Sequence, residues 1–399
     1  MTLSNESSRL SNRRYDLDWL RVLAFSILIL YHVGMFFNHW GWHIKNNELS
    51  HAIELPMRFS SQWRMSLLFM ISGAAVFFAL KKRSGQVFLK ERFTRIFMPL
   101  VFGMFVIVPP QIYLERLTQG ATFSYVDFYP LTFDLQPYPE GNFSWHHLWY
   151  LAYIFVYSVA GLPLLLYIRK QTAASARIAR LSANPAWLIG LPVLWHWGGQ
   201  LLLGPYFPTT NALLDDWNQH FHYFTLFLTG YVFCAHAQFW TSLERQRRLT
   251  LGVAMVLTTV LYGVYWTTDY KPGGWEHDLY ELIATANAWC VLLAIFGYSY
   301  RYLNFSNRFL TYANEAVYPF YILHQTVIVC LAYPLITMSL PVWTKFTYLA
   351  VATFLVCLLL YQFIIKQVSV LRALFGMKAA GSSTKVAPEL PQPERMLLD

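Results

Sequence analysis

The sequence has little charge for its length. Only 13% of its 399 residues are Asp, Glu, Lys or Arg, whereas 56% are hydrophobic and 18% are aromatic. A soluble domain carries about 25% charged residues, so a soluble chain of this composition could not cover its own surface with polar groups. A bilayer removes that need, because lipid becomes the solvent for most of the outside. The composition therefore predicts an integral membrane protein.

Cysteine and processing signals are also scarce. The four cysteines lie inside apolar runs without metal-ligand spacing or a disulfide framework, and we expect them to be packing residues. The polar start is followed by an apolar run too long for a signal peptide and without a small-residue cleavage site. No strong internal repeat and no soluble second domain is indicated. These absences favour a single membrane domain without a metal.

Long apolar runs are what the sequence does contain. A spanning helix needs roughly 20 mostly apolar residues. Candidate spans lie near 19–38, 63–81, 96–114, 147–168, 186–204, 219–240, 249–267, 279–300, 316–336 and 345–366. Pro109 and Pro110 are expected to kink or end the third span. The predicted fold is an all-α polytopic membrane protein with about ten transmembrane helices.

The basic residues predict the orientation of these helices. A net charge of +9 suggests nucleic acid in a soluble protein, but here Lys and Arg gather in alternate loops. Since cytoplasmic loops carry the Lys/Arg excess, both termini are predicted to be cytoplasmic and no nucleic-acid partner is expected. We expect a cytoplasmic N-terminal segment at 1–14, a membrane domain at 15–370 and a partly disordered cytoplasmic tail at 371–399.

The first span contains costly ionisable residues, Arg21 and His32. Eleven residues of helix turn through about 1100°, so both side chains share one face, with His32 about 16 Å deeper. Asp18 lies one turn before Arg21 and could pair with it. The spacing alone also fits a structural interpretation, in which Asp18 and Arg21 are interfacial anchors and His32 is a hydrogen-bonded core histidine.

Arg92 and Arg95 lie one turn apart at the cytoplasmic start of the third span. Because the arginine fork binds phosphate through two hydrogen bonds, this pair could hold an anionic cofactor. Ordinary positive-inside charge is the alternative interpretation.

Further polar and aromatic residues stand in or beside other spans. His324 follows Tyr318 in the ninth span, Trp149 opens the fourth span, Arg64 lies just inside the second, and His43 lies in the first outer loop. Outer aromatic residues suit sugar stacking and interfacial anchoring alike. Spacing does not separate the two.

Taken in order, these stretches resemble acyltransferase family 3, the membrane O-acyltransferases of bacterial envelope glycans. The resemblance rests on LDWLR with YH in the first span, RMSLLFMISG in the second, KERFTRIFMPL before the third, HLWYL in the fourth and YPFYILH in the ninth. It covers about residues 14–370. The outer WHIKN stretch is most similar to the glucan biosynthesis protein C (succinyltransferase) branch.

The resemblance implies an O-acyltransferase of the bacterial inner membrane. The donor would be cytoplasmic acyl-CoA, either succinyl-CoA or acetyl-CoA, and the acceptor a hydroxyl of a periplasmic or cell-envelope glycan. The family's arginine and histidine separated by ten residues match Arg21 and His32, and its arginine pair matches Arg92 and Arg95. The arginines would hold the CoA phosphates and His32 would act as general base or carry a transient acyl group.

The remaining candidates are assigned supporting roles. His324 is a second catalytic candidate, and the candidates for substrate binding are Asp18, His43, Arg64, Trp149 and Tyr318. A homo-oligomer or a glycan-synthesis complex is left open, as is a scaffold role. The main alternative class is a transporter that exports an envelope glycan or a small anion, because buried Arg and His also suit proton coupling.

Overall fold

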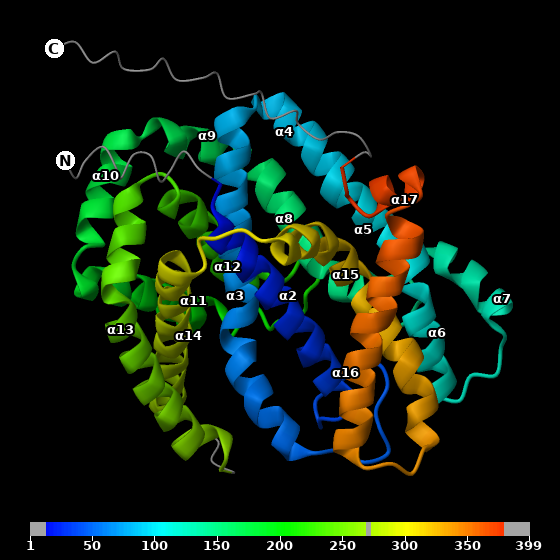
Figure 1. The fold of residues 1–399 in the computed structure, drawn as a ribbon. Coiled ribbons are helices and arrows are strands. Elements are labelled where there is room, and N and C mark those ends of the chain that lie inside the picture. Colours follow the sequence, from blue (N-terminus) through cyan, green and yellow to red (C-terminus); the bar gives the residue numbers. More distant parts are fainter. Residues whose placement is uncertain (1–12, 269–272, 379–399) are drawn as a thin grey trace.

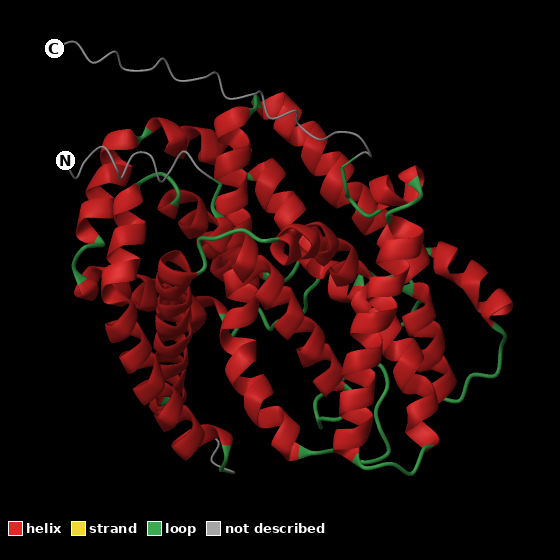
Figure 2. Cartoon of the chain, viewed as in Figure 1, coloured by secondary structure: helices red, strands yellow, loops and turns green. Residues whose placement is uncertain are grey.

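The chain folds into a bundle of helices (Figures 1 and 2). The computed structural model describes residues 13–268 and 273–378. No strand occurs in these two ranges, where Pro137 and Phe143 form an isolated bridge. The α-helices are α2 (Tyr15–Met35), α3 (His51–Lys82), α4 (Gly85–Arg92), α5 (Met98–Phe102), α6 (Pro109–Thr118), α7 (Tyr125–Phe128), α8 (Trp149–Ala160), α9 (Leu162–Lys170), α10 (Thr172–Leu181), α11 (Leu191–Leu203), α12 (Trp217–Phe233), α13 (Ala237–Val260), α14 (Trp275–Tyr302), α15 (Arg308–Ala332), α16 (Val342–Leu359) and α17 (Ser369–Leu374). The predicted all-α fold is confirmed.

Several spans contain a tighter or wider helical turn. The π-helical segments are η1 (Phe93–Phe97), η2 (Gly103–Ile107), η5 (Ala186–Gly190), η6 (Leu261–Trp266) and η8 (Leu360–Ile365), and the 3₁₀ segments are η3 (Tyr129–Asp134), η4 (His146–Leu148) and η7 (Tyr333–Thr337). The expected end of the third span at Pro109 and Pro110 is wrong, because the helical run continues to Thr118, and the alternative of a kink stays a prediction. A π turn precedes the proline, with Val108 N–H donating to Gly103 O at 2.8 Å, and Pro109 then begins α6, a position where proline is tolerated.

Seven helical runs in the described part of the chain are long and apolar enough to cross a membrane. They are Tyr15–Met35, His51–Lys82, Gly85–Thr118, Ala237–Trp266, Trp275–Tyr302, Arg308–Thr337 and Val342–Ile365, and the pair α8 and α9, bent by 55°, makes an eighth if it is one span. The other two predicted spans fall on η5 with α11 and on α12. Both are helical, but α12 has only 17 residues and both carry polar side chains. A multi-pass membrane protein is confirmed, and the count of ten stays a prediction.

The short helix α12 lies inside the bundle because it packs closely on α3. A Cβ added at Gly73 would lie 1.8 Å from Phe227 O, and one added at Gly230 would lie 1.9 Å from Met70 O. Small residues let two membrane helices approach at the backbone. Burial against α3 explains how a helix this polar is accommodated.

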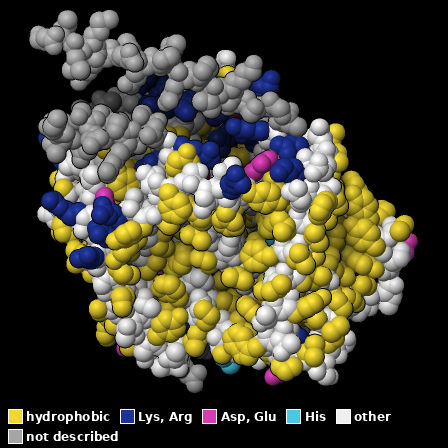
Figure 3. All heavy atoms as spheres, in the orientation of Figure 1, with side chains coloured by type: hydrophobic (Ala, Val, Ile, Leu, Met, Phe, Trp, Pro, Cys, Tyr) yellow, Lys and Arg dark blue, Asp and Glu magenta, His cyan; other side chains and the backbone are white. Residues whose placement is uncertain are grey.

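Basic side chains gather at one end of the bundle. Lys and Arg lie along the upper edge of the view in Figure 3, above a broad apolar surface. The start of α2 and the last helix, α17, lie at this same end in Figure 1, where Arg372 pairs with Glu315 of α15 at 3.2 Å. A cytoplasmic location of this end stays a prediction. Most of the expected tail, 379–399, and residues 1–12 lie outside the described residues.

Candidate active site

Two buried-core helices bring two histidines into contact. His32 is one turn before the end of α2, and His324 lies in the middle of α15. His324 Nε2 is 3.2 Å from His32 Nδ1, and the ring centroids are 4.9 Å apart. The first and ninth predicted spans therefore meet at their histidines.

The hydrogen bonds of the pair fix where the protons lie. His324 Nδ1 is 2.6 Å from Tyr321 O, and His32 Nδ1 is 2.9 Å from Leu28 O. A carbonyl oxygen only accepts, so each Nδ1 carries the proton in the neutral ring. His324 Nε2 then accepts from His32 Nδ1–H. His32 Nε2 keeps a free lone pair, because none of the described residues donates a hydrogen bond to it, and a free imidazole nitrogen can take up a proton.

The predicted arginines converge on one cavity at the basic end of the bundle. Arg21, Arg92 and Arg95 all line a cavity of about 270 Å³ that extends inward to Phe25 and Tyr150. Phe25 lies seven residues before His32 on α2, or about 10 Å along the helix. Along α2, the arginine-lined cavity thus lies at one end of the stretch from Arg21 to His32, and the histidine pair lies at the other end.

Contacts across the cavity hold these arginines in place. Arg21 Nη1 donates to Asn314 Oδ1 of α15 at 3.3 Å, and Tyr318 Oη donates to Arg95 O at 3.0 Å. Arg92 Nε is buried and lacks a hydrogen-bond partner among the described residues. A buried guanidinium N–H without a partner is costly, and an anion in the cavity would satisfy it.

A second cavity of about 630 Å³ adjoins the first and shares Arg21, Arg83 and Arg92 with it. Its other charged lining residues are Arg13, Arg14, Asp18, Lys81 and Lys82. Asp18 is the single acid there and pairs with Arg13 at 2.8 Å and with Arg21 at 3.8 Å. The pairing of Asp18 with Arg21 expected from the sequence is present. The strong positive excess suits a ligand with several phosphates.

On the other side of the histidine pair, a chain of polar side chains leads outward. The His147 and His324 rings are 5.1 Å apart, and His147 Nε2 donates to Ile322 O at 3.0 Å. Gln325 Nε2 donates to Gln111 Oε1 at 2.9 Å and lies 3.0 Å from His43 Nε2. The chain thus joins the membrane-embedded histidines to the first outer loop.

The outer end of the chain is the pair of His43 and Glu115. His43 Nδ1 lies 2.8 Å from Glu115, and Tyr138 Oη donates to the same carboxylate at 2.7 Å. Burial and the neighbouring carboxylate raise the pKa of the Tyr138 phenol. His43, Glu115 and His146 offer ligand atoms within 4.8 Å of one another, but the two imidazole rings are stacked at 4.3 Å, so their in-plane lone pairs do not converge. The predicted absence of a metal is not tested by this arrangement.

Lys45 fastens the outer loop that carries His43. Its Nζ donates to Met35 O at 2.6 Å, to Asn38 O at 2.9 Å and to Asn38 Oδ1 at 2.8 Å. Burial lowers the pKa of Lys45 to about 8. The loop is thereby tied to the end of α2, one turn beyond His32.

Arg64 of α3 stands beside the histidine pair without an acidic partner. Its guanidinium lies 3.4 Å from the centroid of the Tyr31 ring, and Tyr31 and His32 rings are 5.8 Å apart. Arg64 Nε and Nη1 are buried and find no hydrogen-bond partner among the described residues. The Arg64 guanidinium therefore lies close to His32 and has N–H groups that are free to donate.

Trp149 does not reach the histidines. Its ring packs with Phe69 at 6.1 Å, Tyr153 at 5.1 Å and Tyr223 at 5.6 Å, within an aromatic layer between α3, α8 and α12. The α8 residue next to it, Tyr150, is the one that lines the arginine cavity and bonds Ser72 at 2.5 Å. The fourth span therefore contributes to the site through Tyr150 as well as His147.

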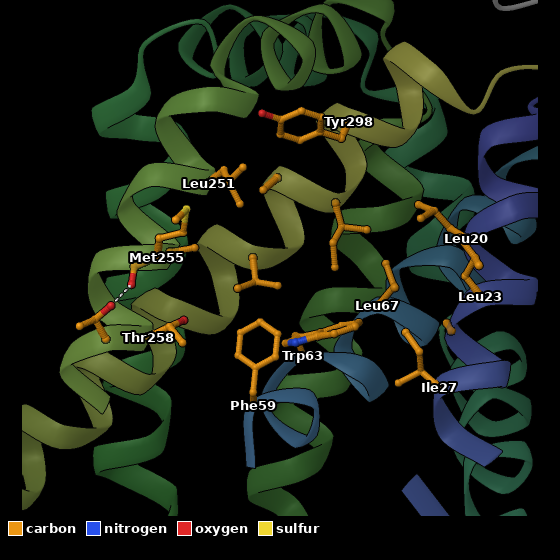
Figure 4. Close-up of a pocket in the computed structure, with 16 residues that line it drawn as sticks. Leu20, Leu23, Ile27, Phe59, Trp63, Leu67, Leu251, Met255, Thr258 and Tyr298 are labelled. Carbon is orange, nitrogen blue, oxygen red and sulfur yellow. Dashed lines mark hydrogen bonds between the residues drawn. The ribbon is translucent and has the colours of Figure 1, made fainter. Parts of the chain in front are cut away.

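A larger apolar groove of about 660 Å³ lies between α2, α3, α13 and α14 (Figure 4). Leu20, Ile27, Trp63 and Met255 are among its labelled side chains. Its lining contains no charged residue and neither histidine of the pair. An apolar groove of this kind suits a membrane lipid better than it suits a catalytic reaction.

Sequence reasoning missed several residues of this site. His147 is visible in the His146–His147 pair, but the spacing of the fourth span gives no sign that it faces His324. Gln111 and Gln325 are single amides inside apolar spans, which is the one sequence signal that could have marked them.

Comparison with known proteins identifies the family. The profile of the acyltransferase domain of acyltransferase family 3 matches residues 14–362. The chain is similar to glucans biosynthesis protein C of Salmonella paratyphi B and of Salmonella dublin, each 23% identical over 332 residues that cover 78% of this chain and 82% of the relative. No solved structure matches. The chain belongs to acyltransferase family 3 and is a membrane acyltransferase.

Proposed function

We propose that this acyltransferase moves a succinyl or acetyl group from cytoplasmic acyl-CoA to a hydroxyl of a periplasmic or cell-envelope glycan, across the bacterial inner membrane. The observation that carries the proposal is the arrangement along α2, with an arginine-lined cavity at Arg21 and a free histidine nitrogen at His32. In this arrangement, α2 would join a phosphate-binding cavity at one end to a general base within the membrane. The acceptor class is suggested by the names of the relatives.

The donor would bind from the basic end. The cavity of about 630 Å³, with its excess of Lys and Arg, would take the nucleotide phosphates, and Arg92 and Arg95 would hold the pyrophosphate through paired hydrogen bonds. The pantetheine arm would extend past Tyr150 and Tyr318 toward His32. Binding energy from the remote nucleotide would thus place the thioester at the base.

His32 would then act as general base. Its Nε2 takes the proton of the acceptor hydroxyl while the oxygen attacks the thioester carbonyl, and the C–S bond breaks as the new C–O bond forms. The same proton passes from His32 Nε2 to the departing CoA thiolate. A transient acyl-histidine on Nε2 is a second route that uses the same free lone pair.

Arg64 would select the acyl group by binding its far end. Its unpaired N–H groups lie next to Tyr31 and His32, where the far end of a short acyl chain would sit. A succinyl carboxylate could accept two hydrogen bonds from the guanidinium, whereas an acetyl group has no carboxylate to accept them. This favours a succinyl donor.

The test is mass spectrometry of envelope glycans from cells with the protein, without it, and with His32→Ala, each checked for protein in the membrane by immunoblot. A mass shift of the acyl group on one glycan, absent without the protein and with His32→Ala, is the expected result. Normal acylation with His32→Ala overturns the mechanism. An exporter would instead change the amount of glycan outside the cell without changing its mass.

A further inference from the structure

A third polar cavity, also of about 270 Å³, lies apart from the two arginine-lined cavities, in the half of the bundle predicted to face outward. Helices α3, α11, α12 and α14 enclose it near the ends that are predicted to face outward. Four side-chain amides from three of these helices line it, Gln62, Gln200, Asn218 and Gln219. Polar side chains gathered inside a membrane domain are costly and point to a function.

One buried polar group in this cavity has no partner. His196 is only 6% exposed, and its Nδ1 finds no hydrogen-bond partner among the described residues. The neighbouring His222 ring lies 4.8 Å away and bonds Ser66 at 3.1 Å. A buried nitrogen left unpaired costs free energy, and a ligand hydroxyl would satisfy it.

The charge of the cavity excludes the acyl donor as its ligand. None of the described residues that line it is Lys or Arg, and Glu281 is its one acid. The amides keep unused capacity, since Asn218 Nδ2 donates to Gln200 Oε1 at 2.8 Å and Gln219 Nε2 to Thr209 Oγ1 at 2.7 Å, while each amide offers two donors and two acceptor lone pairs. Paired donors and acceptors match neighbouring hydroxyls on a neutral ring.

Aromatic rings connect this cavity to the active site. Tyr223 lines the cavity and stacks on Phe69 at 4.4 Å. Phe69 packs on Tyr150 at 5.0 Å, and Tyr150 lies 5.9 Å from Tyr321, one turn before His324. The cavity is thus linked to the histidine pair by a series of ring contacts that ends with Tyr321 against His324.

We infer that this cavity is a subsite for a neutral sugar unit of the acceptor, distinct from the unit that reacts at His32. The inference rests on the proposed function for the identity of the reaction, but the binding itself does not require the donor. A subsite for a remote, non-reacting unit lets an oligosaccharide contribute binding energy that a single sugar cannot.

The test is binding of a linear glucose tetrasaccharide to the full chain in lipid nanodiscs without acyl-CoA, by saturation-transfer NMR. The double substitution Gln200→Leu with Asn218→Leu removes two amides that bond each other, so it leaves no orphaned partner between them. Gln219→Ala is a second variant at a half-exposed position where folding is not at risk. Gln238→Leu, on the exposed inner end of α13, is the matched control.

We expect the tetrasaccharide to bind the wild type and Gln238→Leu equally, and both cavity variants at least tenfold more weakly. In turnover assays, KM for the tetrasaccharide rises by about tenfold in the cavity variants while KM for the acyl donor is unchanged. No saturation transfer with the wild type, or equal binding by Gln219→Ala and the control, overturns the subsite. Binding by the wild type without any acyl transfer would overturn the proposed function alone and support the subsite.

Discussion

His32 donates from Nδ1 to His324 Nε2 across 3.2 Å, and His324 is held by Tyr321 O at 2.6 Å. This fixes the ring of His32 so that its Nε2 is the free nitrogen. We therefore propose that His324, a catalytic candidate from the sequence, acts through His32 as a positioning residue.

His324→Leu should lower kcat by about 10- to 100-fold with KM for the donor unchanged. One of the two acceptors of His32 Nδ1–H is lost, and Leu28 O alone then orients the ring. His324→Gln should recover most of the rate, since its amide oxygen can accept the same hydrogen bond. Steady-state kinetics in nanodiscs measures both variants. Equal rates for Leu and Gln would contradict the positioning role.

Arg92→Ala with Arg95→Ala should raise KM for acyl-CoA by about tenfold or more, because charge-assisted hydrogen bonds to phosphate are lost. The KM for the acceptor should stay the same. Arg58→Ala is a suitable control, because Arg58 is partly exposed and lies near the start of α3. Lys82 and the arginine-lined cavities lie at the opposite end of this helix. Unchanged donor saturation in the double variant would remove the pair from the CoA site.

Arg64→Leu should lower the rate with succinyl-CoA by at least about tenfold relative to the rate with acetyl-CoA. The carboxylate of the succinyl group loses its partner, whereas the acetyl group never had one. A competition assay with both donors, followed by mass spectrometry of the product, measures the ratio. A ratio that does not change would show that Arg64 does not read the acyl group.

Gly73→Ala should prevent assembly of the bundle, because a Cβ there would overlap Phe227 O of α12. Gly198→Ala in α11 is the matched control, since an added Cβ at Gly198 meets nothing within 4 Å. Fluorescence-detected size exclusion of the two variants in detergent compares folded protein. Equal yield and melting temperature would contradict the close packing of α3 on α12.

The sequence predicts the parts of the site that lie on one helix. Helical periodicity places Arg21 and His32 on one face, and in the structure both contact α15, through Asn314 and His324. Composition and hydropathy likewise predict the all-α fold.

Contacts between helices could not be predicted in this way. Nothing in the period of the fourth span tells that His147 faces His324, since the pairing of helices is set by packing in three dimensions. The position of the Trp149 ring, away from the histidines and in the aromatic layer, is also set by packing between helices, because Phe69 and Tyr223 come from two other helices. The sequence predicts a span near 219–240, but it gives no sign that a glycine contact with α3 holds the shorter helix α12 in the bundle.

The acyl group is proposed to pass from a donor on one side of the membrane to an acceptor on the other. Sealed proteoliposomes of known orientation separate the two substrates, with succinyl-CoA supplied only on the side of Arg92 and Arg95 and a glucose tetrasaccharide only on the opposite side. We expect acylated tetrasaccharide in the acceptor compartment with the wild type and none with His32→Ala. Product that forms only when both substrates share one compartment would overturn transfer across the membrane.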